Sequence, residues 1–286
     1  MNSKKINIGV IGSGHLGQYH VKHYKNMNNI NFLGLHDSNP ERGNEIAKKY
    51  ETKYFENVSN LMEVCDGVSI VTPTESHYDV AKIALNEFCC NVFIEKPITE
   101  TISQADDLIN HAQKNDLIIQ VGHIERLNPA LKALEKYDIN PKFIDIQRLA
   151  PYTARGTDVP VVLDLMIHDI DILLSLVKSK VKSIHASGVS ILTNSVDIAH
   201  ARIRFENGTV SSVTASRVAK DKVRKIKIFQ DNLYSTIDLL LEQTEIYNIT
   251  KDSNLIENAL QAEPFPGDNE KKYIVYEKPK IKNYDS

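Results

Sequence analysis

The sequence predicts an α/β protein with two domains. We expect an N-terminal Rossmann domain with a doubly wound parallel sheet, then an α+β domain with a mainly antiparallel sheet. Strand and helix patterns alternate from residue 6 to residue 123, as they do in successive βαβ units. Beyond residue 123 the strands follow one another closely, and Asn207-Gly208 is typical of a hairpin turn. We therefore predict domains at residues 1–123 and 124–286.

The first predicted strand leads into a glycine-rich turn. Alternating apolar residues at 6–11 form the strand, and the sequence GSGHLG follows it and opens a helix. In this pattern Gly12 permits the tight turn, Gly14 lets backbone N–H groups approach a pyrophosphate, and Gly17 lets the helix pack on its strand. An ordinary glycine-rich turn is the alternative, but its place between a strand and a helix favours a dinucleotide site. The expected phosphate loop consists of Gly12, Gly14, His15, Leu16 and Gly17.

Asp37 ends the second predicted strand, at residues 31–36, where the ribose of a dinucleotide would lie. A carboxylate at this place accepts hydrogen bonds from both ribose hydroxyls and repels a 2′-phosphate, so we expect NAD rather than NADP. Asp37 also fits the start signal of the helix at Pro40, and both roles are compatible. Arg42, which lies nearby in sequence, would favour some tolerance of NADP.

The remaining N-terminal strands are expected at residues 53–55, from 67 to the Thr72-Pro73 turn, at 91–95 and at 117–122. Helices are expected at 40–50 and 103–114, with another helix carrying His77. Ligands of such sheets bind beyond the carboxyl ends of the strands. The further candidates for cofactor contacts are Thr72, Pro73, His77 and Glu95, and His123 is a candidate for substrate contact.

The composition is that of an ordinary globular protein, with 42% hydrophobic and 25% charged residues in 286. The net charge of −3 provides no basic surface for nucleic acid or an acidic membrane. The three cysteines, Cys65, Cys89 and Cys90, have no metal-ligand spacing, and we expect buried thiols in a reducing compartment. We therefore expect no metal site. No uncharged run reaches the roughly 18 residues of a membrane helix, so we expect a cytoplasmic protein.

The C-terminal half is expected to begin with a short helix at 128–137, a strand at 143–149 and a polar loop at 150–158. An apolar helix at 159–177 should follow. Apolar and polar residues then alternate at 199–206, which predicts a strand with one buried face, and the segments 225–229 and 233–239 flank a second turn.

Two places could supply the base that oxidation of an alcohol requires. Lys96 lies between Glu95 and Pro97 at the end of a strand, although a solvated lysine there is common. The helix at 159–177 carries Asp164, His168, Asp171 and Ser175 on one stripe. A solvated helix face is the alternative, but carboxylates around one imidazole are suited to general base catalysis.

These motifs together resemble the glucose–fructose oxidoreductase/inositol dehydrogenase/rhizopine catabolism family (Gfo/Idh/MocA). The resemblance rests on GSGHLG, Thr72-Pro73 followed by His77, Glu95-Lys96-Pro97, and Asp164-x-x-x-His168, and it covers both domains in order. It implies that the second domain has an open sheet often used for oligomerisation. It also implies that Lys96, Asp164 and His168 meet the substrate near the nicotinamide.

Within the family, residues 121–129 and 162–171 are most similar to the UDP-N-acetylglucosamine 3-dehydrogenase branch. We therefore expect NAD-dependent oxidation of a sugar or sugar nucleotide. An inositol or free-aldose dehydrogenase and a catalytically silent NAD-binding regulator are the alternatives. Arg126, Arg148 and Arg155 are candidates for binding a phosphorylated substrate, unless they are surface arginines at the join between domains.

A homodimer or homotetramer is the expected assembly, because a broad apolar sheet face is poorly covered by one helix. Members of the family usually continue past the last strands into a helical segment. The chain ends at Ser286 soon after the last predicted strand, which fits either a trimmed chain or a short member.

Overall fold

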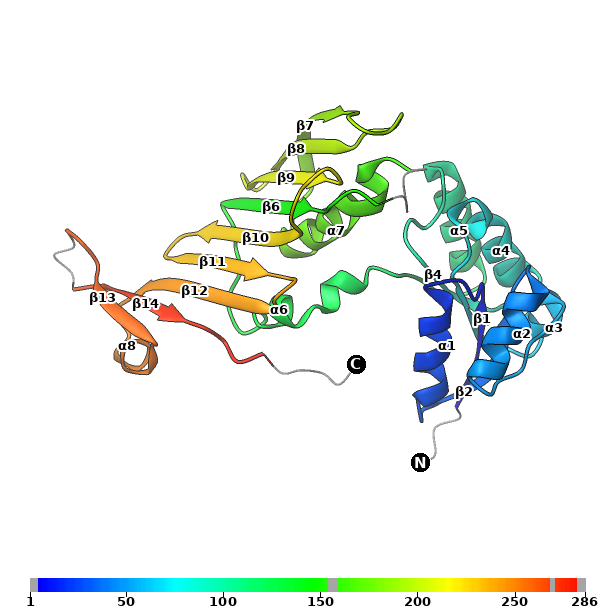
Figure 1. Ribbon diagram of the computed structural model, residues 1–286. Coiled ribbons are helices and arrows are strands. Elements are labelled where there is room, and N and C mark those ends of the chain that lie inside the picture. The colour runs from blue at the N-terminus through cyan, green and yellow to red at the C-terminus, as the bar shows by residue number, and fades with distance from the viewer. Residues whose placement is uncertain (1–4, 154–158, 268–270, 282–286) are drawn as a thin grey trace. The chain divides into compact units, whose positions relative to one another are not determined.

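The computed structural model describes residues 5–153, 159–267 and 271–281. The chain divides into two compact units, residues 1–123 and 124–286, each with its own sheet (Figure 1). None of the helices in the described ranges is long and apolar enough to cross a membrane.

The N-terminal unit is a parallel sheet with the strand order β2-β1-β3-β4-β5 (Figure 1). Val10 and Ile11 point to opposite faces of β1, and they belong to two separate core clusters. Helices α1 and α2 contribute to one cluster, and α4 and α5 contribute to the other, as the predicted double winding requires. The strands are β1 (Ile6–Ile11), β2 (Ile30–His36), β3 (Gly67–Ile70), β4 (Asn91–Ile94) and β5 (Ile119–Val121). The helices are α1 (Gly17–Asn26), α2 (Pro40–Lys49), α3 (Val58–Met62), α4 (Thr74–Asn86) and α5 (Ile102–Lys114).

Two local predictions for this unit are wrong. The expected strand at 53–55 is a single bridge between Leu35 and Tyr54. Lys53 O and Phe55 N both bond to the backbone of Leu35, and Phe55 O bonds to the ring of His36 rather than to the backbone of β2, so no ladder develops. The expectation of buried thiols holds for Cys65 and Cys90, but Cys89 is exposed.

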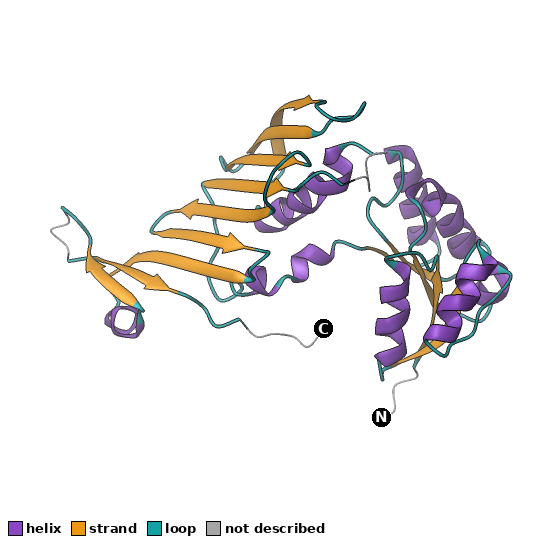
Figure 2. Cartoon of the chain, in the orientation of Figure 1, coloured by secondary structure: helices purple, strands orange, loops and turns teal. Residues whose placement is uncertain are grey.

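The C-terminal unit contains a sheet with the order β13-β14-β12-β11-β10-β6-β9-β8-β7, shown as orange arrows in Figure 2. Every neighbouring pair is antiparallel except β6 and β9, which run parallel. The strands are β6 (Phe143–Leu149), β7 (Val181–Val189), β8 (Ile198–Phe205), β9 (Val210–Ser216), β10 (Val223–Gln230), β11 (Leu233–Asp238), β12 (Gln243–Thr250), β13 (Gln261–Pro264) and β14 (Tyr273–Glu277).

The helices of this unit are shorter than predicted. The expected helix at 128–137 is only the single turn α6 (Pro129–Lys132), which a 3-10 turn, η1 (Ile124–Leu127), precedes. The expected helix at 159–177 begins as a π-helix, η2 (Val162–Met166), and continues as α7 (Ile167–Leu176). Ile172 and Leu173 of α7 pack in one core cluster with the inward side chains of the sheet. A further short helix is α8 (Ser253–Asn258).

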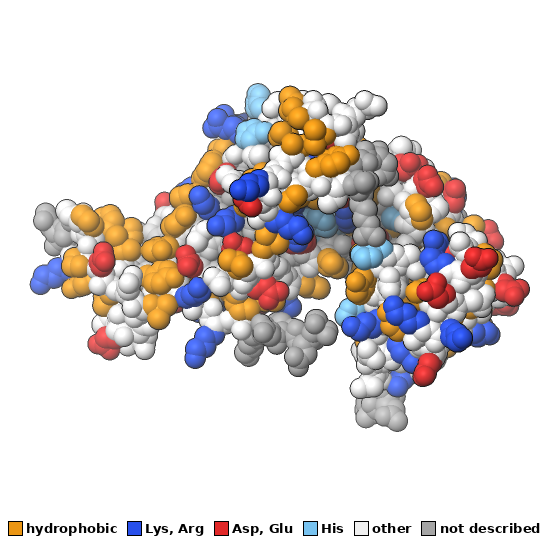
Figure 3. Space-filling view, viewed as in Figure 1, with side chains coloured by type: hydrophobic (Ala, Val, Ile, Leu, Met, Phe, Trp, Pro, Cys, Tyr) orange, Lys and Arg blue, Asp and Glu red, His pale blue; other side chains and the backbone are white. Residues whose placement is uncertain are grey.

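The opposite face of the sheet carries five aromatic side chains in register on adjacent strands, which we call the aromatic row. Its members are Phe143, Phe229, Tyr234, Tyr247 and Tyr276. Successive ring centroids are 5.9, 4.8, 5.7 and 5.0 Å apart. Hydrophobic side chains also gather over β12, β13 and β14 in the space-filling view (Figure 3).

Candidate active site

The N-terminal unit has a cavity of about 440 Å³ beyond the carboxyl ends of β1, β2 and β3. The loop after β1 contributes Gly12, Gly14 and Leu16 to its wall, and the turn after β3 contributes Thr72 and Pro73. Asp37 and Arg42 lie in the wall beyond β2. The cavity therefore brings together six of the predicted cofactor residues and lies where open α/β sheets bind nucleotides.

The conformation of the glycine loop fits a phosphate group. Gly12 has φ +90°, and a Cβ atom there would lie 2.7 Å from the carbonyl oxygen of Val71. A Cβ atom on Gly17 would lie 1.9 Å from the carbonyl oxygen of Gly12, so no other residue fits between loop and helix. At Gly14 an added Cβ would meet nothing within 4 Å, which leaves the loop backbone open to an approaching ligand.

The wall of the cavity also presents a hydroxyl group. Thr72 Oγ1 is buried, and no hydrogen-bond partner for it lies among the described residues. Buried polar atoms are nearly always bonded, so this hydroxyl is suited to a bound ligand. Together with the open loop at Gly14, it makes the cavity a fitting site for a dinucleotide.

Asp37 is buried and accepts five hydrogen bonds. Its Oδ2 accepts from Ser13 N and Ser13 Oγ, both at 2.7 Å, and from Arg42 Nε at 3.0 Å. Its Oδ1 accepts from Asn39 N at 2.8 Å and Arg42 Nη2 at 2.7 Å. Burial works to raise the pKa of Asp37, but the hydrogen bonds from Arg42, Asn39 and Ser13 outweigh it and lower the pKa from 3.8 to about 2. The stabilisation from Asp37 is therefore complete above pH 3.8 and is lost as the pH falls towards 2.

This pairing gives Asp37 and Arg42 opposite effects on cofactor choice. We expect Arg42→Ala to weaken NADPH binding more than NADH binding, because it leaves the carboxylate uncompensated beside a 2′-phosphate. Asp37→Ala should weaken NADH binding by about tenfold or more, since a hydrogen bond to a charged group contributes about 1.5–3 kcal/mol. Titration of the fluorescence of each reduced cofactor measures both effects. Tighter NADPH than NADH binding in the unmodified protein would contradict the expected preference.

The Glu95-Lys96-Pro97 turn follows β4, and Lys96 in it is half-buried. Glu95 is 9% exposed, and its Oε1 lies 3.1 Å from Nε2 of His20. His77 is 1% exposed, and its two ring nitrogens each lie 2.9 Å from a backbone carbonyl oxygen, of Pro97 and of Thr72. Both ring nitrogens of His77 therefore have partners within the protein, and its contact with the cofactor stays a prediction. His15, which is exposed, and Gly17 do not line the cavity.

In the C-terminal unit, η2 and α7 carry Asp164 and His168, which are both half-buried. A π-turn adds a residue to the turn between them, and such turns are frequent at functional sites. The predicted polar stripe is wrong beyond His168. Asp171 is buried against Arg126 and bonds to it through both carboxylate oxygens, and Ser175 bonds to the carbonyl oxygen of Ile172.

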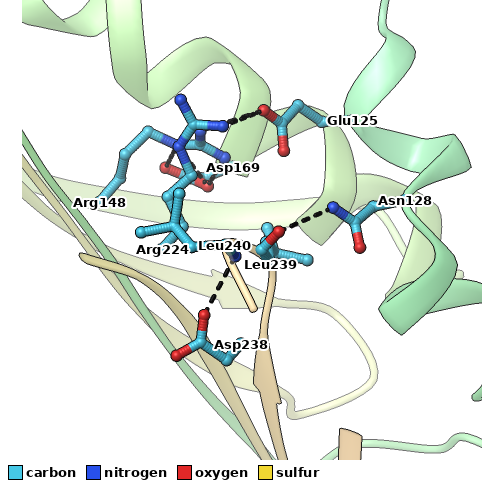
Figure 4. A network of polar contacts seen from close by, with 8 residues as sticks. All are labelled: Glu125, Asn128, Arg148, Asp169, Arg224, Asp238, Leu239 and Leu240. Atoms are coloured by element: carbon cyan, nitrogen blue, oxygen red, sulfur yellow. Dashed lines mark hydrogen bonds and ion pairs between the residues drawn. The ribbon is translucent and has the colours of Figure 1, made fainter. Parts of the chain in front are cut away.

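Beneath α7 lies an ion-pair network that the sequence analysis did not identify (Figure 4). Arg148 is 2% exposed, and its Nε and Nη2 donate to the Asp169 carboxylate at 2.8–3.0 Å. Glu125 Oε1 accepts from Arg148 Nη1 at 3.4 Å and from Arg224 Nη1 at 2.9 Å. Burial opposes the charge of Arg148, but its bonds with Asp169 outweigh this effect and raise its pKa. Two cations and two anions therefore balance one another, with Arg148 and Asp169 enclosed and Arg224 partly exposed.

The three candidate arginines for a phosphorylated substrate differ in their surroundings. Arg148 is enclosed and cannot reach a substrate phosphate. Arg126 is exposed, but its guanidinium is held by Asp171. Arg155 lies outside the described residues. His123 is half-buried at the end of the N-terminal unit, and no cluster of three or more potential metal ligands occurs in the described ranges.

Comparison with known proteins bears on both units. Residues 6–123 match the model of the oxidoreductase family with an NAD-binding Rossmann fold, and residues 146–232 match the GFO/IDH/MocA C-terminal domain. The chain is 38% identical over 241 residues to a UDP-N-acetylglucosamine 3-dehydrogenase from Acidithiobacillus ferrooxidans, covering 84% of this chain and 76% of that protein. The chain belongs to the Gfo/Idh/MocA family.

A solved structure and a second relative also match the chain over most of its length. A crystal structure of the Acidithiobacillus ferrooxidans enzyme superposes with a TM-score of 0.82 at 37% identity, over 86% of this chain and 81% of that one. The myo-inositol 2-dehydrogenase of Thermotoga maritima is 26% identical over 83% of this chain and 79% of its own length. As a Gfo/Idh/MocA protein, the chain is an oxidoreductase with an NAD(H)-binding Rossmann unit, and the predicted fold class is confirmed.

Proposed function

We propose that this protein oxidises the 3-hydroxyl of UDP-N-acetylglucosamine, with NAD⁺ as the hydride acceptor. The observation that carries the proposal is the 38% identity with a UDP-N-acetylglucosamine 3-dehydrogenase over 84% of this chain. Three inositol dehydrogenases that it also matches are only 24–27% identical. The product would be the corresponding 3-keto sugar nucleotide.

The catalytic roles in this proposal fall to three side chains. His168 takes the proton of the substrate hydroxyl, and Asp164 orients His168 or the substrate. Lys96 stabilises the negative charge that develops on the oxygen. When bound, NAD⁺ supplies the hydride acceptor, and the glycine loop, Asp37 and Thr72 would hold its adenosine diphosphate half. Lys96 and His168 could exchange the roles of cation and base, since either side chain can carry a proton.

A panel of sugars tests the substrate assignment. We expect UDP-N-acetylglucosamine to give rapid reduction of NAD⁺, followed by absorbance, and free N-acetylglucosamine to give little, because it lacks the anionic diphosphate. Efficient oxidation of myo-inositol or glucose without activity on the nucleotide sugar would overturn the substrate but not the family. Binding of NADH with no reduction on any sugar would favour a silent regulator.

For assembly, we propose a homodimer, or a dimer of such dimers, that pairs through the aromatic row. The row places five rings on the face of the sheet opposite α7, and Phe143 and Phe229 are 38% and 40% exposed. Apolar groups of this size are usually covered in a stable assembly.

The variant Phe229→Glu tests this assembly, because it places a charge within the row. We expect the unmodified protein to be oligomeric at micromolar concentration by light scattering and the variant to shift towards monomer. Ile118→Glu, at a residue that is 66% exposed in the N-terminal unit, is the matched control and should leave the mass unchanged. A monomeric unmodified protein would count against the proposal.

A further inference from the structure

Beside the Glu95-Lys96-Pro97 turn lies a buried polar chain that the proposed mechanism does not use. It runs from Ser69 on β3 through His20 on α1 to Glu95 at the end of β4. Ser69 Oγ lies 2.9 Å from Nδ1 of His20, and Glu95 Oε1 lies 3.1 Å from Nε2 of the same ring. Ser69 is 0% exposed, and the side chains of His20 and Glu95 are 18% and 11% exposed.

The Glu95 carboxylate can only accept, which fixes the direction of its hydrogen bond with His20. A neutral His20 ring satisfies both contacts when Nε2 donates to the Glu95 carboxylate and Nδ1 accepts from the Ser69 hydroxyl. The Phe93 ring lies 5.4 Å from the imidazole and limits its rotation. Ser69 is too enclosed to act as a nucleophile on an external substrate. The buried polar chain therefore holds the Glu95 carboxylate in place.

Packing on the other side leaves Glu95 little room to move. A Cβ atom on Gly122 would lie 2.9–3.0 Å from the carboxylate atoms of Glu95, so the carboxylate is enclosed between His20 and the backbone at Gly122. The backbone N–H of Glu95 donates to the carbonyl oxygen of Ile70 at 3.1 Å. On the far side of Lys96, His77 bonds to the carbonyl oxygen of Pro97. One histidine thus anchors the residue before Lys96, and another anchors the residue after it.

We propose that His20 is a positioning residue for Lys96, acting through the Glu95 carboxylate. His20 lies in the first turn of α1, directly after the glycine loop, so the same helix end that adjoins the cofactor cavity also fixes the turn that presents Lys96. Without the imidazole donor, the Glu95 carboxylate turns from His20 to the neighbouring ammonium group and shifts its position. The inference deepens the proposed function and rests on it where turnover is the measurement.

The first test uses turnover of the full-length protein. We expect His20→Leu to lower kcat by about ten- to a hundredfold, because a small misplacement of a catalytic group has effects of this size, with the Kd for NADH unchanged. His20→Gln, whose amide N–H can replace Nε2 as donor, should recover most of the loss. His23→Leu, at an exposed residue of the same helix, is the matched control. Added to Lys96→Ala, His20→Leu should cause no further loss.

The second test does not depend on catalysis. Trace acetylation of the amines, quantified at Lys96 by mass spectrometry, should be several-fold slower in His20→Leu than in the unmodified protein, because the released carboxylate pairs with the ammonium and stabilises its protonated form. Gly122→Ala should have the same effect, since the added methyl group displaces Glu95 from His20.

The two tests separate this inference from the proposed function. If Lys96→Ala retains full turnover, the catalytic role of Lys96 fails, and the acetylation rate alone decides whether His20 positions it. Unchanged acetylation of Lys96 in both His20→Leu and Gly122→Ala would overturn the inference, whatever the activity. Independent, multiplicative losses from His20→Leu and Lys96→Ala would overturn it as well.

Discussion

His168→Ala should lower kcat by about a hundredfold or more, because a positioned general base contributes about 10²–10⁴-fold to such a reaction. The Kd for NADH should stay unchanged, since His168 belongs to the C-terminal unit and the cofactor cavity is lined by residues of the N-terminal unit. The measurement is steady-state turnover with UDP-N-acetylglucosamine beside fluorescence titration of NADH. Lys96→Ala should give a loss of similar size through poorer stabilisation of the alkoxide.

Ser175→Ala is the matched control for the helix. Ser175 is exposed on α7, and its hydroxyl bonds only locally, to the carbonyl oxygen of Ile172, so its loss should leave turnover and stability nearly unchanged. Near-normal turnover in both His168→Ala and Lys96→Ala would show that these residues have structural roles. A loss confined to one of them would leave only that side chain with a role in catalysis.

Arg148→Met should destabilise the protein by about 3–5 kcal/mol, the cost of breaking a buried ion pair by removing one partner. The side chains of Arg148 and Asp169 are 2% and 1% exposed, so water cannot solvate the carboxylate that is left behind. Two anions, Asp169 and Glu125, would then face the single cation Arg224. Chemical denaturation measures the loss, and Lys142→Ala should cost much less, because its side chain is 64% exposed and its partner Asp231 is 80% exposed.

The double variant Arg148→Met/Asp169→Leu separates charge balance from packing. It removes one cation and one anion together, so Glu125 and Arg224 still compensate each other. We expect it to recover a large part of the stability lost in Arg148→Met, because an apolar pair of similar volume often replaces a buried ion pair without loss. If the double variant loses as much stability as Arg148→Met and Asp169→Leu lose together, packing rather than charge explains the loss.

The N-terminal unit was largely predictable because its signals are local. The alternation at residues 6–11 and the glycine spacing after it specify a strand, a turn and a helix within one short segment. The bridge at Tyr54 shows the limit of this reasoning, since three extended residues have no sequence signal that separates a bridge from a strand. His20 was missed because a single histidine on a helix carries no periodicity, and its partners Ser69 and Glu95 are distant in sequence.

The C-terminal unit was harder to predict because several of its charged side chains bond to one another within the protein. Arg148 continues the alternation of Ile144 and Ile146, which places it on the buried face of β6, so its burial could have been inferred from the strand pattern. Its partner could not, because Asp169 and Asp171 are indistinguishable by type from the solvated carboxylates of an amphipathic helix. The π-turn likewise has no signal in a run of apolar residues.

The position of β6 in the sheet has a consequence for how the chain reaches this fold. β6 lies between β9 and β10, which are consecutive in sequence and joined by a short connection at residues 217–222. Neighbours so close along the chain pair most readily with each other as a hairpin, and such a hairpin would close the gap that β6 occupies. Such a mispaired sheet would be a kinetic trap, which early docking of β6 would prevent. Because β6 precedes both strands, a chain growing from its N-terminus has β6 available first, so we expect folding during synthesis to be more efficient than refolding from denaturant.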